Sequence, residues 1–110
     1  MKVIYRTLGL LIFMFTSSAV ADCVGGSCTN VKIKKMYVTA NGGTVISTLG
    51  DEAKLTCNAG NSGYISLDQN ASNYSSTYSL LLTAHTTEHP IWVRTTETGS
   101  CKVVYIVSDI

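Results

Sequence analysis

Two histidines and a glutamate near the end of the chain have a spacing that can bind zinc. His85, Glu88 and His89 form the pattern His-x-x-Glu-His, which occurs on helices of some zinc-dependent peptidases. Residues four apart share a helix face, but Pro90 disfavours helical geometry at His89, and a catalytic zinc needs a third protein ligand. Glu97, the only later glutamate, falls in a predicted turn. We therefore predict no metal site, with His85 partly buried at a helix end and Glu88 and His89 in solvent.

Other arrangements that could support catalysis are weak. The chain has many serines and threonines but no Gly-x-Ser-x-Gly motif and no phosphate-binding loop. Asp51 and Glu52 are adjacent, and we interpret them as a solvated turn rather than an acid–base pair. We therefore expect no catalytic residue, no cofactor and no enzymatic activity. Tyrosine, serine, threonine and asparagine are abundant, and with Trp92 they suit the binding of polar, neutral ligands such as sugars.

The first 21 residues have the pattern of a signal peptide. Lys2 and Arg6 precede an apolar run, and Ala19-Val20-Ala21 fits the small-x-small site that a signal peptidase cuts. The apolar run is shorter than the roughly 20 residues that span a bilayer. We predict cleavage after Ala21, no membrane anchor in the mature chain, and a secreted or periplasmic location.

The mature chain, residues 22–110, has 89 residues and is expected to form a single domain. It keeps all seven acidic residues but only six of the eight basic ones, so its net charge is about −1. Nothing in this charge argues for binding of nucleic acid, which needs a basic face. Its four cysteines are Cys23, Cys28, Cys57 and Cys101. An even number of cysteines in a small exported domain predicts two disulfides.

Five strands and one helix are predicted from periodicity. The strands cover residues 31–39, 44–49, 64–68, 91–95 and 101–109, and the helix runs from Tyr74 toward Pro90 with Asn73 or Ser72 as its N-cap. The apolar alternation of the first strand slips across Lys34-Lys35, which predicts a bulge or bend. Asn41-Gly42 predicts a hairpin between the first two strands, because both residues can adopt positive φ.

The element order β-β-β-α-β-β predicts a mostly β fold with one helix, a five-stranded OB-type Greek-key barrel. The bent first strand would serve both sheets of such a barrel. The helix would close its open end, with Leu80, Leu81 and Leu82 among the buried residues. An open α+β sheet and a two-layer sandwich are the alternative folds.

Several segments resemble one known family. Residues 78–94 (YSLLLTAHTTEHPIWVR) and 101–106 (CKVVYI), with IKKMYVTANG at 33–42 and DEAKLTC at 51–57, resemble small secreted bacterial OB-fold proteins. That family includes the B subunits of subtilase cytotoxin and typhoid toxin. The resembling segments cover most of the mature chain.

The OB fold that the resemblance implies also suggests a disulfide pairing. In an OB barrel the third and fifth strands are parallel neighbours, so Cys57 and Cys101 would lie at the same end of the sheet. We expect Cys57–Cys101, worth about 4 kcal/mol in the chain-entropy model, and Cys23–Cys28, worth about half as much. The rival pairing is Cys28–Cys101 with Cys23–Cys57.

The resemblance further implies a ligand site and partners. In the toxin B subunits a serine before the bent first strand and a tyrosine after the fourth strand contact sialic acid. Thr29 stands at the serine position with Ser27 nearby, and Thr95 stands at the tyrosine position. Those subunits form homo-pentamers that carry a separate enzymatic subunit.

Two functions are compatible with these observations. The first is a secreted, non-catalytic glycan-binding module similar to a toxin B subunit, with an enzymatic partner. The alternative is a periplasmic OB-fold domain that binds a protein, as an inhibitor or an envelope factor.

Overall fold

The computed structural model describes residues 21–109, so residues 1–20 of the predicted signal peptide lie outside the described part of the chain. The elements, in chain order, are β1 (Asp22–Val24), β2 (Ser27–Val31), β3 (Ile33–Val38), β4 (Thr44–Thr48), the short 3-10 helix η2 (Glu52–Lys54), β5 (Ile65–Leu67), α1 (Tyr74–Thr87), β6 (Ile91–Thr95) and β7 (Lys102–Val107). The predicted class, mostly β with one helix, is confirmed.

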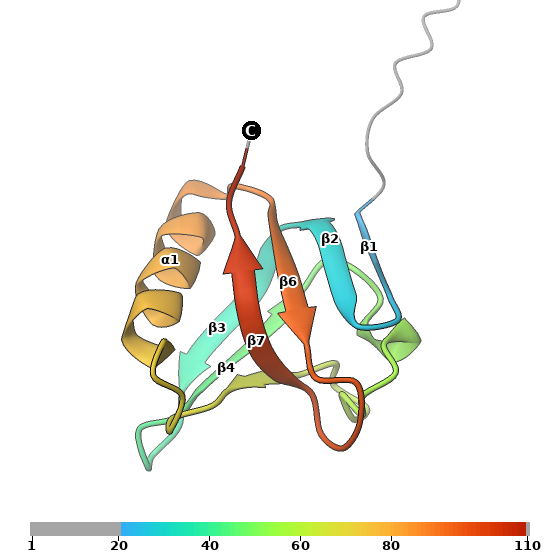
Figure 1. The fold of residues 1–110 in the computed structure, drawn as a ribbon. Coiled ribbons are helices and arrows are strands. Elements are labelled where there is room, and N and C mark those ends of the chain that lie inside the picture. Colours follow the sequence, from blue (N-terminus) through green and yellow to red (C-terminus); the bar gives the residue numbers. More distant parts are fainter. Residues whose placement is uncertain (1–20, 110) are drawn as a thin grey trace, which may run out of the picture.

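The strands form one mixed sheet of seven, in the order β1-β2-β6-β7-β5-β4-β3. Among the strand pairs within residues 21–109, only β5–β7 is parallel, as expected for the third and fifth predicted strands. The sheet curls into a half-barrel, with α1 and the β1–β2 hairpin at opposite sides in Figure 1. The prediction of five strands is wrong by two, because the hairpin around Gly25-Gly26 has cysteines in place of the aliphatic residues that signal a strand.

The predicted irregularity in the first strand is present. The β3–β4 register shifts between Ile33 and Lys35, and the strand itself is broken at Lys32, between β2 and β3. Ile33 is buried and Met36 packs against the core, while Lys34 and Lys35 between them are both exposed. The slip in the apolar alternation therefore corresponds to a β-bulge.

The predicted hairpin at Asn41-Gly42 joins β3 and β4. Thr39 and Gly43 close the turn, the Thr39 N–H donating to the Gly43 carbonyl at 2.7 Å. Only Gly42 has a positive φ, of 91°, whereas Asn41 does not. The turn is thus longer than the two-residue turn in which both central residues have positive φ.

Apolar side chains from the sheet and one face of α1 fill the core. The fully or nearly fully buried ones include Val31, Ile46, Ile65, Leu81, Ile91 and Val93. Of the three leucines expected in the core, Leu81 is buried, Leu80 is half-buried and Leu82 is 42% exposed, so the prediction for Leu82 is wrong. Thr77, Leu81 and Ala84 form the buried stripe of the helix. Leu82 follows Leu81 by about 100° around the axis, which turns it away from the sheet.

Two disulfides, Cys23–Cys28 and Cys57–Cys101, tie the fold together. Cys23 and Cys28 face each other across the β1–β2 hairpin. Cys57 precedes β5 and Cys101 precedes β7, and the parallel pairing of these strands brings both cysteines to one end of the sheet. This is the pairing expected from the fold hypothesis. Its physical basis is the one expected, because β5 and β7 are parallel neighbours.

Candidate functional site

The zinc-like motif is divided by the end of the helix. His85 lies in the last turn of α1, and Glu88 adopts a left-handed conformation, with φ of 56°, that ends the helix. His89 is therefore off the helix, and its Nε2 lies 3.1 Å from the Asp109 carbonyl oxygen. His85 and His89 are half-buried, and Glu88 is exposed. Within residues 21–109 no three His, Cys, Asp or Glu side chains are grouped so that they could hold a metal ion.

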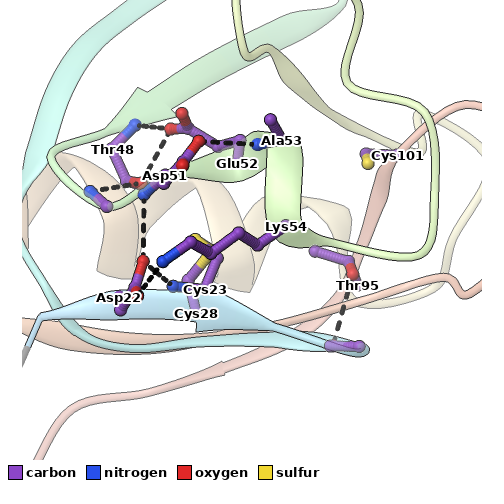
Figure 2. The surroundings of a disulfide bond; sticks show 12 residues. Asp22, Cys23, Cys28, Thr48, Asp51, Glu52, Ala53, Lys54, Thr95 and Cys101 are labelled. Atoms are coloured by element: carbon purple, nitrogen blue, oxygen red, sulfur yellow. Dashed lines mark hydrogen bonds and ion pairs between the residues drawn. A yellow bond between two sulfur atoms is a disulfide. The ribbon is translucent and has the colours of Figure 1, made fainter.

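The adjacent carboxylates Asp51 and Glu52 have separate structural roles. Asp51 accepts a hydrogen bond from the Ala53 N–H at 3.1 Å and caps η2. Glu52 is 8% exposed, and its carboxylate accepts hydrogen bonds from the Thr48 N–H and from the Thr48 hydroxyl at 2.7 Å, as Figure 2 shows. The interpretation of Glu52 as solvated is therefore wrong. A buried carboxylate persists where hydrogen bonds compensate its lost hydration, and here the end of β4 supplies them.

An ion pair anchors the start of the described chain. Lys54 Nζ lies 2.9 Å from Asp22 Oδ2, and the Cys23 N–H donates to Asp22 Oδ1 at 2.8 Å (Figure 2). The hydrogen bond from Lys54, followed by that from Cys23, lowers the pKa of Asp22. The same contact raises the pKa of Lys54. The pair fastens β1 to η2.

Ser27 and Thr29, two of the predicted ligand residues, share the outer surface of β2. Cys28 between them is fully buried, so strand alternation places the two hydroxyl residues on the opposite, outward side. Both are half-buried. They form part of a larger surface that continues onto the neighbouring strands.

Ser27 belongs to a row of paired residues that crosses four strands. Val24 of β1 pairs with Ser27, Ser27 pairs with Arg94 of β6, and Arg94 pairs with Tyr105 of β7. Directly paired residues lie on the same face of an antiparallel sheet. Trp92, two residues before Arg94 on β6, faces the same way. We call this surface the Trp92 face, comprising Val24, Ser27, Thr29, Trp92, Arg94 and Tyr105.

The Trp92 face exposes large side chains. Trp92 and Tyr105 are each 45% exposed, and Val24 is 70% exposed. β6 and β7, which carry the two aromatic residues, lie side by side in Figure 1. Aromatic residues with one solvated edge are typical of recognition surfaces, because they offer both an apolar ring and a polar tip.

Arg94 is fixed at the centre of this surface. Its Nη2 lies 2.6 Å from Glu97 Oε2, three residues later. A Cβ atom at Gly26 would approach the Arg94 guanidinium to 3.0 Å, so the glycine leaves room for the arginine over the hairpin turn. The guanidinium therefore lies over Gly26, and Glu97 balances its charge.

Thr95, the third predicted ligand residue, lies inside the fold. It is 1% exposed, and its hydroxyl donates to the Gly26 carbonyl at 3.2 Å, a contact drawn in Figure 2. Its N–H also donates to the Gly26 carbonyl, at 2.8 Å. Thr95 fastens β6 to the hairpin turn and does not form part of the Trp92 face.

Arg94 and Tyr105 were not among the predicted site residues. The strand IWVRT, residues 91–95, carries the signal for one of them, because its buried residues alternate with outward Trp92 and Arg94. The bulge in the β6–β7 pairing between Arg94 and Thr95 hides the signal for Tyr105, since Val104 and Tyr105 are both exposed. Only the register identifies Tyr105 as the partner of Arg94.

Comparison with protein-family models, with curated proteins and with solved structures gives no match for this chain. A function for this chain is therefore inferred from its fold and from the Trp92 face. The chain forms a small curled β-sheet domain with one helix and two disulfides. Two disulfides indicate an oxidising place outside the cytoplasm. No helix within residues 21–109 has the length and apolar character needed to cross a bilayer.

Proposed function

We propose that the protein is a secreted or periplasmic, non-catalytic module that binds a glycan on the Trp92 face. The observation that carries this proposal is the row of Ser27, Arg94 and Tyr105 across neighbouring strands, with half-exposed Trp92 beside it. Aromatic rings pack against the apolar faces of sugar rings, and hydroxyl and guanidinium groups hydrogen-bond their hydroxyls. Because Glu97 balances Arg94, this surface suits a polar ligand of low net charge.

We further propose that the domain is an OB-type barrel. β2 and β3 are joined through Lys32 and stand near the two ends of the sheet order, as one bent first strand would. The parallel β5–β7 pair and the position of α1 between β5 and β6 support the same topology. The OB architecture is compatible with oligosaccharide binding.

A glycan array probed with the protein tests this function directly. Trp92 is the only tryptophan, so a saccharide that binds this face should change the intrinsic fluorescence. Trp92→Ala should weaken binding of the retained saccharide about tenfold or more, because truncated aromatic anchors are costly. Leu82→Ala, an exposed apolar residue on α1, is the matched control and should bind normally.

Two outcomes would contradict glycan binding at this face. One is an array with no retained saccharide, and the other is a Trp92→Ala variant that binds as the wild type does. The first outcome would favour the alternative, a protein partner that acts with this domain as an inhibitor or envelope factor. Val24, 70% exposed at the end of the row, is the observation that favours a protein surface there.

The resemblance to toxin B subunits extends the proposal to a homo-pentamer that carries an enzymatic subunit. Light scattering after size exclusion tests this extension, with a mass of five mature chains as the expected result. A monomer that retains no saccharide would contradict the toxin-subunit function.

A further inference from the structure

Three lysines gather where β2 meets β3. Lys32, Lys34 and Lys35 lie within four consecutive positions, and all three are exposed. The ion pairs within residues 21–109 are Lys54–Asp22 and Arg94–Glu97, so these three lysines lack a carboxylate partner there. The cluster therefore carries a net positive charge on a domain whose total charge is about −1.

The β-bulge turns two of these lysines to the same side. Ile33 pairs with Thr48 and Lys35 pairs with Ser47, so Lys34 is the extra residue. Ile33 is buried, and both Lys34 and Lys35 are exposed. A bulge re-aims side chains in this way, and here it doubles the positive charge on the outer surface of β3.

Two tyrosines lie beside Lys35 at that surface. Lys35 Nζ donates a hydrogen bond to the Tyr64 hydroxyl at 3.3 Å and lies 5.6 Å from the centre of its ring. Tyr37 meets Tyr64 edge to face, with ring centres 5.6 Å apart. Lys35 thus contacts Tyr64, and the ring of Tyr64 packs against Tyr37. The loop before Tyr64 packs closely against buried Glu52. A Cβ atom at Gly63 would lie 2.6 Å from Glu52 Oε1, so glycine permits this approach.

An exposed leucine completes the surface. Leu49 is 61% exposed, and its N–H donates to the Lys32 carbonyl at 3.0 Å. Leu49 comes directly after β4, and this hydrogen bond places it beside Lys32. We call this surface the β3 strip, comprising Lys32, Lys34, Lys35, Tyr37, Leu49 and Tyr64.

We propose that the β3 strip docks the domain on the surface of an anionic lipid bilayer. Lysines are attracted to anionic headgroups, while tyrosine and leucine side chains enter the boundary between headgroups and acyl chains. A soluble polyanion would engage the lysines but leave Leu49 without a partner. Lysines also protect edge strands from pairing with other chains, but that role does not require exposed Leu49 beside them. The β3 strip shares no residue with the Trp92 face, so this proposal does not depend on the glycan site.

Co-sedimentation with vesicles tests the proposal. We expect the protein to bind vesicles of phosphatidylglycerol and phosphatidylcholine in equal parts, to bind vesicles of phosphatidylcholine alone much less, and to lose binding in high salt. Each lysine near an anionic surface should strengthen binding about fivefold, so Lys34→Ala/Lys35→Ala should weaken it about 25-fold. Leu49→Ser should also weaken binding while leaving the net charge unchanged.

The matched control removes one charge elsewhere. Lys35→Ala and Lys54→Ala change the net charge equally, but Lys54 is already paired with Asp22. Lys35→Ala should lower vesicle binding about fivefold, and Lys54→Ala should leave it nearly unchanged. Circular dichroism confirms that each variant is folded. Equal losses in the two variants, or no preference for phosphatidylglycerol, would overturn the proposal. Binding to dextran sulfate without binding to vesicles would overturn it in favour of a soluble polyanion.

Discussion

The two outer surfaces of the sheet differ in how their positive charges are balanced. On the Trp92 face, Arg94 is paired with Glu97 at 2.6 Å, and the exposed area is largely aromatic. On the β3 strip, three lysines have no carboxylate partner within residues 21–109. One small sheet can therefore present an aromatic surface with balanced charge and a second surface with a long-range positive potential. Salt should therefore weaken binding at the β3 strip far more than binding at the Trp92 face.

Each surface also depends on a different disulfide. Cys23–Cys28 closes the hairpin that carries Val24 and Ser27 of the Trp92 face. Cys57–Cys101 fastens the segment before β5, which leads to Tyr64 of the β3 strip, to the start of β7. Removing one disulfide at a time should therefore impair binding at one surface more than at the other.

The largest effect is expected for the long-range disulfide. Cys57→Ser/Cys101→Ser should lower the free energy of unfolding by about 4 kcal/mol, because the bond joins residues 44 apart, and Cys23→Ser/Cys28→Ser by about 2 kcal/mol. Guanidinium denaturation of both variants measures this difference. Where the variants remain folded, the first should mainly weaken vesicle binding and the second saccharide binding. Equal destabilisation by the two changes would contradict the expected dependence of stability on the length of the closed loop.

A core substitution should destabilise the whole fold and therefore weaken binding at both surfaces alike. Leu81→Ala removes a fully buried side chain beneath the sheet and should cost about 3 kcal/mol. Leu82→Ala changes the neighbouring, 42% exposed side chain and should cost less than about 1 kcal/mol. Thermal unfolding of the two variants provides the comparison. A cost for Leu82→Ala as large as that for Leu81→Ala would show that the helix packs through a different face.

The smallest effect concerns pH and the hairpin of the Trp92 face. The lowered pKa of Asp22 means that its pair with Lys54 stabilises the fold above the ordinary aspartate value, and that this stabilisation is lost as pH falls through the folded pKa. The raised pKa of Lys54 means that its contribution is present below the ordinary lysine value and is lost as pH rises through the folded pKa.

Asp22→Asn should therefore flatten both the acid and the alkaline limb of the stability profile. Unfolding free energies of the wild type and the variant, measured across pH at low salt, test this expectation. An unchanged acid limb in the variant would mean that another carboxylate governs it.

Local sequence patterns predicted much of the fold. Pro90 and the apolar spacing located the helix, which ends at Thr87. The slip at Lys34-Lys35 predicted the bulge, and Asn41-Gly42 predicted the hairpin. These features depend on residues close together in the chain, where steric and hydrogen-bonding preferences act directly. The β1–β2 hairpin was missed because its inward residues are disulfide-bonded cysteines.

The candidate site was predicted only in part. Ser27 and Thr29 lie on an outward surface, but Thr95 is buried and Arg94 and Tyr105 are the residues that stand beside Ser27. Glu52 likewise follows an exposed neighbour in the sequence yet is buried against Thr48. A strand pattern distinguishes two faces but does not tell which residue of a distant strand comes opposite.

Sequence patterns alone predict the class of fold, the helix, the bulge and the presence of two disulfides, because local preferences and the number of cysteines suffice for these. Only the packed chain shows which residues meet on the Trp92 face, that Arg94 pairs with Glu97, and that Leu82 faces solvent. Register between distant strands follows from how the whole core packs, and a shift of one residue would exchange the inner and outer faces.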